Sequence, residues 1–202
     1  MPLSPALVMA LASHCAPAVA PETLVSVVRV ESAFDPLAIG VNRPTAERLH
    51  PRSLPDAIAT ATRLIASGAN IDIGLGQINI RNLVALRLTV AGAFDPCRNL
   101  AASAQLLAAD YDLAGPRPGA EQAALRTSFS LYNTGDALRG FRNGYVAKVV
   151  AAAGRIVPAL QPDQHTPAAS APPSTSAWDV FGRPAGPSAA FVFTPAVPGD
   201  AP

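Results

Sequence analysis

The stretch Leu24-Val25-Ser26-Val27-Val28-Arg29-Val30-Glu31-Ser32 is an apolar segment that ends in a single carboxylate. Its apolar side chains recur at helical spacing, and Pro21 fits the first turn of the helix that would carry them. Burial beside valines penalises the ionised form of an acid, so Glu31 requires a partner or a chemical role. A lone Glu at a helix end is usually solvated, and the case for a functional Glu31 therefore depends on later segments.

The first of these segments is Gly74-Leu75-Gly76-Gln77-Ile78-Asn79, a polar break between apolar residues. Its two glycines would allow the backbone to approach a ligand closely. The amides of Gln77 and Asn79 can each donate and accept hydrogen bonds, which suits a polar ligand. The segment is therefore a candidate wall of a binding cleft.

The second segment is Leu131-Tyr132-Asn133-Thr134-Gly135, at the end of a predicted helix. Asn133, Thr134 and Gly135 alone would be an ordinary helix C-terminus. Because Tyr132 lies beside Asn133 at this end, both side chains can project into a cleft. The order of Glu31 and the two polar segments predicts one site.

Helical spacing extends through most of the chain, which predicts a mainly α fold. Residues 34–53 contain four prolines or glycines and predict a loop with a small hairpin, and residues 70–73 predict a short strand. Helices are expected over residues 5–16, 21–32, 54–67, 80–88, 96–111, 121–132 and 144–157, with a short helical turn over 136–141.

Composition limits the possible functions. The chain has 202 residues, a formal net charge of +1 and 14% charged residues, so nothing in its charge favours nucleic acid. No apolar stretch reaches the roughly 20 residues of a membrane span. His14, His50 and His165 share no ligand spacing, so we expect neither a metal site nor a cofactor.

The last 42 residues differ from the rest, because they contain nine of the 21 prolines and almost no apolar periodicity. We therefore expect a folded domain over residues 1–160 and a disordered Pro/Ala-rich tail over residues 161–202. Trp178 and Phe181 form an aromatic island in this tail. Exposed aromatics of this kind serve as docking anchors for a partner, and the alternative is that they pack back on the domain.

From about Leu11 to Pro158 the chain resembles the lytic transglycosylase (lysozyme-like) domain that cuts bacterial peptidoglycan. Within that superfamily it looks most like the transglycosylases of type IV secretion systems, because of Cys15-Ala16-Pro17 and Asp95-Pro96-Cys97. Gly76 departs from the superfamily pattern, which usually carries Met there in the sugar-stacking wall. The matching segments are Val30-Glu31-Ser32, Ile39-Gly40-Val41-Asn42, Gly74 to Asn79, Leu131 to Gly135, and Tyr145 after Asn143-Gly144.

The resemblance implies a lysozyme-like α+β domain in which Glu31 is the catalytic acid and Tyr145 orients it. It also implies that the enzyme cleaves the bond between N-acetylmuramic acid and N-acetylglucosamine and forms a 1,6-anhydro sugar. One carboxyl suffices for that reaction. The residues expected to contact the glycan strand are Ser32, Asn42, Gln77, Asn79, Tyr132 and Asn133; capping of its helix is the alternative role for Ser32.

Two other functions compete with this interpretation. A hydrolytic lysozyme would need a second carboxylate, for which Asp35 and Asp72 are the candidates. A non-catalytic peptidoglycan-binding scaffold would gain nothing from a buried Glu31.

The two cysteines, Cys15 and Cys97, suggest one disulfide if the chain enters an oxidising compartment and two buried thiols if it does not. A peptidoglycan substrate places the chain in the periplasm, where we predict the disulfide and expect secretion-system partners to bind the tail. No Lys or Arg precedes Arg29, so we expect an export signal that is atypical or missing from this start.

Overall fold

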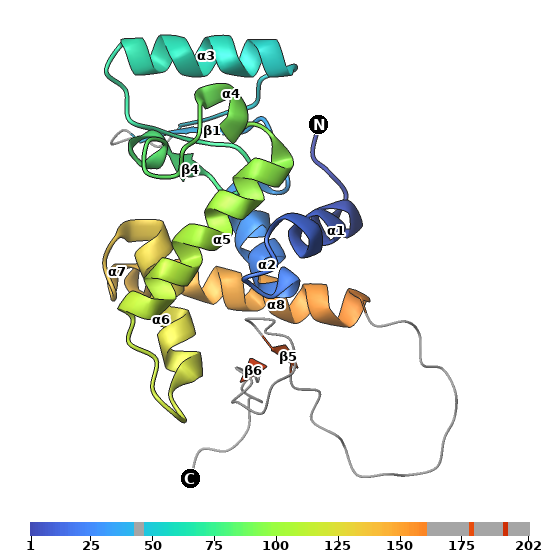
Figure 1. Ribbon diagram of the computed structural model, residues 1–202, viewed down its shortest axis with the longest axis vertical. Helices are drawn as coiled ribbons and strands as arrows, with labels where there is room; N and C mark the ends of the chain where they lie inside the picture. The colour runs from blue at the N-terminus through green and yellow to red at the C-terminus, as the bar shows by residue number, and fades with distance from the viewer. Residues whose placement is uncertain (43–46, 161–177, 180–191, 194–202) are drawn as a thin grey trace.

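The computed structural model describes residues 1–42, 47–160, 178–179 and 192–193, and it is mainly helical with a small antiparallel sheet, as predicted (Figure 1). Its helices are α1 (Pro5–Cys15), α2 (Pro21–Ser32), α3 (Leu54–Ala66), α4 (Val90–Ala93), α5 (Pro96–Leu113), α6 (Glu121–Thr134), α7 (Arg139–Arg142) and α8 (Tyr145–Leu160), with a 3₁₀ turn η1 (Ile80–Asn82). Its strands are β1 (Ile39–Val41), β2 (Glu47–Leu49), β3 (Ile71–Ile73), β4 (Ile78–Asn79), β5 (Trp178–Asp179) and β6 (Val192–Phe193).

A helical lobe contains the larger core, in which α2 is packed by α1, α5 and α8. Eight of the twelve residues of α2 are buried, among them Leu24, Val25, Val27 and Val28, because helices cover it on several sides. Pro21 begins this helix at its first turn, and Ala33 ends it in the left-handed conformation. The apolar sequence before Glu31 is therefore a buried helix rather than a strand.

The sheet lobe contains a second core, formed by the sheet, α3, α4 and the start of α5. The four strands are antiparallel in the order β2-β1-β3-β4. Figure 1 shows α3 above this sheet and α5 running from the sheet lobe to α6. Ile39, Ile73 and Ile78 face the core from neighbouring strands. Because side chains alternate between the faces of a strand, the intervening polar residues lie on the other face of the sheet.

The expected helix over residues 80–88 is wrong. Only η1 is helical there, and turns follow it to Arg87, whose φ of 53° lies in the left-handed region. The amide of Leu88 donates to the carbonyl of Leu83 and closes the segment. Burial of Leu83 in the sheet-lobe core favours this compact turn over a regular helix, and α4 follows it. The other expected helices are present, and none of their ends is shifted by more than three residues.

Cys15 and Cys97 form a disulfide, and their Cα atoms are 5.4 Å apart. The bond joins the last residue of α1 to the first turn of α5 across 82 residues of sequence. It therefore ties the N-terminal helix to the helix that spans both lobes.

Most of the predicted tail, including Phe181, lies outside the described residues. Within it, β5 and β6 pair as a short antiparallel ribbon, which the sequence did not predict. Among the described residues, no helix is long and apolar enough to cross a membrane.

Candidate active site

Glu31 lies on the last turn of α2, and the residue is 9% exposed. The hydroxyl of Tyr145, at the first residue of α8, donates a hydrogen bond to its Oε1 at 2.5 Å. These two residues are 114 positions apart in sequence, and the packing of α2 against α8 brings them together. The tyrosine therefore orients the one acid that closes the apolar helix.

Burial raises the pKa of Glu31 from 4.5 to about 7. The hydrogen bond from Tyr145 opposes this rise because it favours the carboxylate, and the charge of Asp72 adds to it. The guanidinium of Arg48 lowers the pKa slightly. Near neutral pH, Glu31 can therefore both hold a proton and release it, which a general acid and base requires.

The chain turns sharply after α2. Ala33 and Phe34 have φ angles of 52° and 69°, a region that non-glycine residues adopt at a cost of about 1 kcal/mol or more each. Asp35 then accepts hydrogen bonds from the amide of Leu37 and from Nδ1 of His50. Because Asp35 is used in this way and is not among the residues lining the cleft beside Glu31, it is not a second catalytic acid.

Asp72 and two asparagines form the polar face of the sheet. Asp72 lies opposite Gly40 on β1 and opposite Asn79 on β4. Its Oδ1 accepts a hydrogen bond from Nδ2 of Asn79 at 2.6 Å, and its Oδ2 accepts one from Nδ2 of Asn42 at 2.9 Å. Burial raises the pKa of Asp72, while these two bonds lower it. Asp72 thus fixes the orientation of both amides.

The turn between β3 and β4 is held by a residue that the sequence analysis missed, Asn99 on α5. Its buried amide accepts from the backbone of Gly76 and donates to the carbonyls of Ile73 and Ala93. Gly74, at φ 79°, packs so closely against Asn99 that a Cβ would overlap it. The sequence signal that could have identified Asn99 was a polar residue among the apolar positions of α5.

Gln77 has a structural role in this turn. Its Nε2 donates to the carbonyls of Ala38 and Gly74, at 3.1 and 2.9 Å, so its donor group is already used. Its φ of 51° is again left-handed. Only its carbonyl oxygen is left to accept a hydrogen bond from a ligand.

Gly76 and Tyr132 join the turn to α6. The hydroxyl of Tyr132 donates to the carbonyl of Gly76 at 2.7 Å. A Cβ on Gly76 would overlap Oγ of Ser103 and lie 2.9 Å from the hydroxyl oxygen of Tyr132. The absence of a side chain at position 76 therefore follows from the close approach of α5 and α6, and a Met here would point into those helices.

Asn133 and Asn143 position the start of α8. Nδ2 of Asn143 donates to Oδ1 of Asn133 at 3.0 Å, and Oδ1 of Asn143 accepts from the backbone amide of Tyr145 at 2.9 Å. The end of α6 is thereby linked to the tyrosine that contacts Glu31.

A polar cleft of about 750 Å³ lies between the sheet lobe and α6–α7, with Glu31 in its wall. Among the predicted residues, Asn42, Gln77, Asn79, Tyr132 and Asn133 also line it, and Tyr145 contacts it through Glu31. The lining is completed by Asp72, by residues 134–135 and by six residues for which the sequence predicted no contact with the glycan strand: Asn70, Arg81, Asn82, Leu106, Arg139 and Asn143.

Ser32 is not part of the cleft. Its buried hydroxyl donates to the carbonyl of Val28 within α2, and the residue lines a separate pocket beside Asp35 and His50. The expectation that Ser32 contacts the glycan strand is therefore not supported, and its alternative role within the helix fits the geometry.

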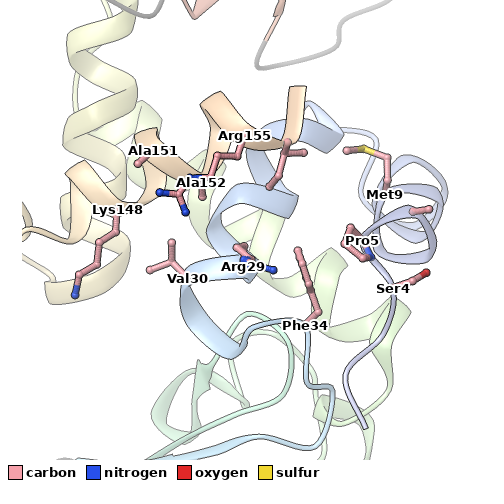
Figure 2. Close-up of a pocket in the computed structure, with 12 residues that line it drawn as sticks. Ser4, Pro5, Met9, Arg29, Val30, Phe34, Lys148, Ala151, Ala152 and Arg155 are labelled. Atoms are coloured by element: carbon pink, nitrogen blue, oxygen red, sulfur yellow. The ribbon is translucent and has the colours of Figure 1, made fainter. Parts of the chain in front are cut away.

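A second cavity, of about 730 Å³, lies between α1, α2 and α8. Figure 2 shows Met9, Val30 and Phe34 around it, with Arg29, Lys148 and Arg155 among its polar groups. No carboxylate is among its lining residues, so acid–base chemistry belongs to the polar cleft. The part of the chain that the structure describes contains no group of three or more His, Cys, Asp or Glu residues suited to a metal ion.

Comparison with known proteins agrees with this geometry. Residues 9–147 match the family described as the transglycosylase SLT domain. Protein virB1 of Agrobacterium fabrum (strain C58 / ATCC 33970) is 42% identical over 185 residues, which cover 90% of this chain and 73% of that protein. Type IV secretion system protein virB1 of Brucella abortus biovar 1 is 45% identical over 151 residues, which cover 72% of this chain and 63% of that protein. No solved structure matches the chain significantly.

Proposed function

This chain belongs to the transglycosylase SLT domain family, and from that premise we propose that it is a peptidoglycan lytic transglycosylase. Its substrate is the β-1,4 bond between N-acetylmuramic acid and N-acetylglucosamine, and its product carries a 1,6-anhydro-N-acetylmuramic acid end. The observation that carries the proposal is Glu31, a buried acid in the wall of a polar cleft, with the hydroxyl of Tyr145 on its Oε1.

In the first step, protonated Glu31 gives its proton to the glycosidic oxygen, and the bond from the anomeric carbon to that oxygen breaks. The N-acetyl oxygen of the substrate stabilises the positive anomeric carbon. In the second step, the Glu31 carboxylate takes the proton of the C6 hydroxyl, whose oxygen then bonds to the anomeric carbon. The acid is restored and no water is consumed.

The hydrogen bond from Tyr145 eases proton release in the first step. It stabilises the carboxylate that forms when Glu31 loses its proton, and it leaves the other carboxyl oxygen to face the substrate. Burial favours the protonated form and serves the first step. A pKa near 7 is the balance of these opposing effects.

Asp72 supports the competing hydrolytic mechanism, because it lines the same cleft and its charge raises the pKa of Glu31. A lysozyme of that kind would use Asp72 to activate a water molecule or to attack the sugar. Both oxygens of Asp72 already accept hydrogen bonds from asparagine amides, which favours a role in holding Asn42 and Asn79. We therefore place Asp72 among the positioning residues.

Digestion of purified sacculi tests the proposal. The wild-type protein should release muropeptides with anhydro ends, and Glu31→Gln should reduce the rate by roughly a thousandfold or more, because one group supplies both proton transfers. Glu22→Gln, on the first turn of the same helix, is the matched control and should keep full activity. Reducing-end products would indicate a hydrolase, and the absence of products would indicate a binding scaffold.

We also propose that the enzyme acts in the periplasm and opens the cell wall locally for a type IV secretion system. The Brucella relative is a type IV secretion system protein, which supports this setting. The disulfide between Cys15 and Cys97 also supports it, because disulfides persist in oxidising compartments. Thiol labelling after unfolding should find both cysteines blocked in protein taken from the periplasm. Two reactive thiols would contradict the assignment.

Residues 1–160 are then the catalytic domain and residues 161–202 a segment that docks on a secretion-system protein through Trp178 and Phe181. Every residue proposed for catalysis precedes position 160. Deletion of residues 161–202 should leave the cleavage of isolated sacculi intact and weaken binding to a periplasmic partner. Equal loss of cleavage in the shortened protein would contradict this division.

A further inference from the structure

Two arginines of the cleft have no role in the proposed reaction. Arg81 enters the lining from η1, beside the sheet, and Arg139 enters it from α7, on the helical side. Both side chains are exposed. Among the described residues, neither guanidinium has a carboxylate within 4.0 Å, whereas the nearby Arg142 is paired with Asp136 at that distance.

The acids that the structure describes around the cleft form no ion pair with these arginines, although the charge of Asp136 attracts Arg139 at longer range. Asp72 is bound by the amides of Asn42 and Asn79, and Glu31 by the hydroxyl of Tyr145. Asp136, the acid next to α7, uses Oδ1 to accept the backbone amides of residues 138 and 139. Among the described residues, the cleft thus contains two guanidinium groups that are in no ion pair, one on each side of a shared polar space.

We propose that Arg81 and Arg139 form a carboxylate-binding site that recognises the acidic substituent of the muramic acid residues in the strand. This inference rests on the proposed function, because it takes the glycan strand as the ligand of the cleft. The sugar hydroxyls and N-acetyl groups are neutral. The only anionic groups near the glycan are carboxylates, either on the peptide stem or, where the stem has been removed, on the lactyl arm.

The chemistry of arginine suits this ligand. A guanidinium is always charged and offers a planar set of donors that matches both oxygens of a carboxylate. An amide such as that of Asn82 or Asn143, which lie in the same lining, would bind a neutral sugar equally well. Arginines on both sides therefore provide selectivity for charged strands over neutral ones.

Binding of soluble glycan strands by the full-length Glu31→Gln protein tests the site without cleavage. Three ligands are compared: strands that keep their stems, strands stripped by an amidase so that the lactyl carboxylate is free, and stripped strands whose lactyl carboxylates have been converted to methyl esters. The structure predicts that charged strands bind more tightly than the ester strands. That advantage should shrink as NaCl is raised, because salt screens an exposed ion pair.

In this background Arg81→Gln and Arg139→Gln should each weaken the binding of charged strands about threefold, and the pair about tenfold, with no change for the ester strands. The charge-retaining pair Arg81→Lys and Arg139→Lys should restore only part of the loss, because lysine keeps the charge but lacks the planar set of donors. Arg117→Gln, an exposed arginine outside the cleft, removes one charge and should change nothing. Circular dichroism spectra show whether each variant folds.

The ligands also separate the two sources of the carboxylate. A loss confined to stem-bearing strands assigns the site to the peptide, and a loss confined to stripped strands assigns it to the lactyl arm. The proposal is overturned if the double glutamine variant weakens the binding of ester strands equally, or if it binds charged strands as tightly as its parent. Failure of the proposed reaction would instead appear as the absence of anhydro products from the wild-type protein, whatever the binding result.

Discussion

The buried acid makes the stability of the protein depend on pH in a calculable way. Burial raises the pKa of Glu31 from 4.5 to about 7, and an unfolded chain restores the ordinary value. The folded protein therefore binds more protons than the unfolded chain between these two pH values. The free energy of unfolding must fall as pH rises through this window. The contribution of Glu31 to that free energy does not change with pH below pH 4.5 or well above pH 7.

The magnitude follows from the gap between the two pKa values. Each tenfold change in proton affinity is worth about 1.36 kcal/mol, so the gap corresponds to about 3 kcal/mol. Glu31→Gln cannot ionise and keeps a side chain of similar shape. At pH 5 the variant should be close to the wild type in stability, and at pH 8 it should be more stable by about 3 kcal/mol.

Urea unfolding followed by far-ultraviolet circular dichroism at pH 5, 6, 7 and 8 measures this difference. Asp110, whose pKa burial also raises, contributes equally to both proteins and cancels in the comparison. The charge of Asp72 acts on Glu31, so the difference between the two proteins includes this coupling. A difference between wild type and Glu31→Gln that stays the same at every pH would refute the buried-acid interpretation. It would mean that Glu31 is solvated and has an ordinary pKa.

Three further results are expected. Tyr145→Phe removes the hydrogen bond that lowers the pKa of Glu31, so the loss of activity at alkaline pH should move to higher pH. The maximum rate should fall about tenfold or more. An unchanged pH–rate profile would contradict this role of Tyr145. Asp72→Asn should cost at most about thirtyfold in rate on sacculi, far less than Glu31→Gln. It should also move the loss of activity at alkaline pH to lower pH, because the charge of Asp72 raises the pKa of Glu31. If it is as damaging as Glu31→Gln and the products lack anhydro ends, the two-carboxylate mechanism is correct. Replacing Cys15 and Cys97 with Ser should lower the free energy of unfolding by about 4 kcal/mol in urea titrations, and a loss below 1 kcal/mol would count against a constraining bond.

Local features of the structure could be read directly from the sequence. The helical spacing of the apolar run before Glu31, with Pro21 in the first turn, predicted α2. Ser53 and Asp95 accept hydrogen bonds from the amides of Asp56 and Arg98 and so begin α3 and α5. Such caps depend on residues within one turn of each other, and a sequence pattern contains that information.

The same reasoning failed at residues 80–88, where helical spacing did not produce a helix. A turn buries Leu83 against the sheet lobe while leaving Val84 exposed and Arg87 at positive φ. Tertiary packing overrides local propensity in a segment this short.

The roles of the polar side chains were decided by the tertiary structure alone. A sequence shows that Gln77 and Asn79 can donate hydrogen bonds, but only the fold shows that those donors are already used by backbone carbonyls and by Asp72. It also directs Ser32 away from the cleft. Hydrogen bonds are short and directional, so the function of each amide depends on neighbours that are distant in sequence.

The sequence by itself determined that this is a mainly helical domain with one acid placed at the end of a buried helix. The fold decided what that acid can do, because the approach of α8 brings Tyr145 onto Glu31 and removes water from the carboxyl. The free energy of ionising a carboxyl depends on the groups and solvent within a few ångströms of it. In this protein those groups come from helices more than a hundred residues apart, and only folding brings them together.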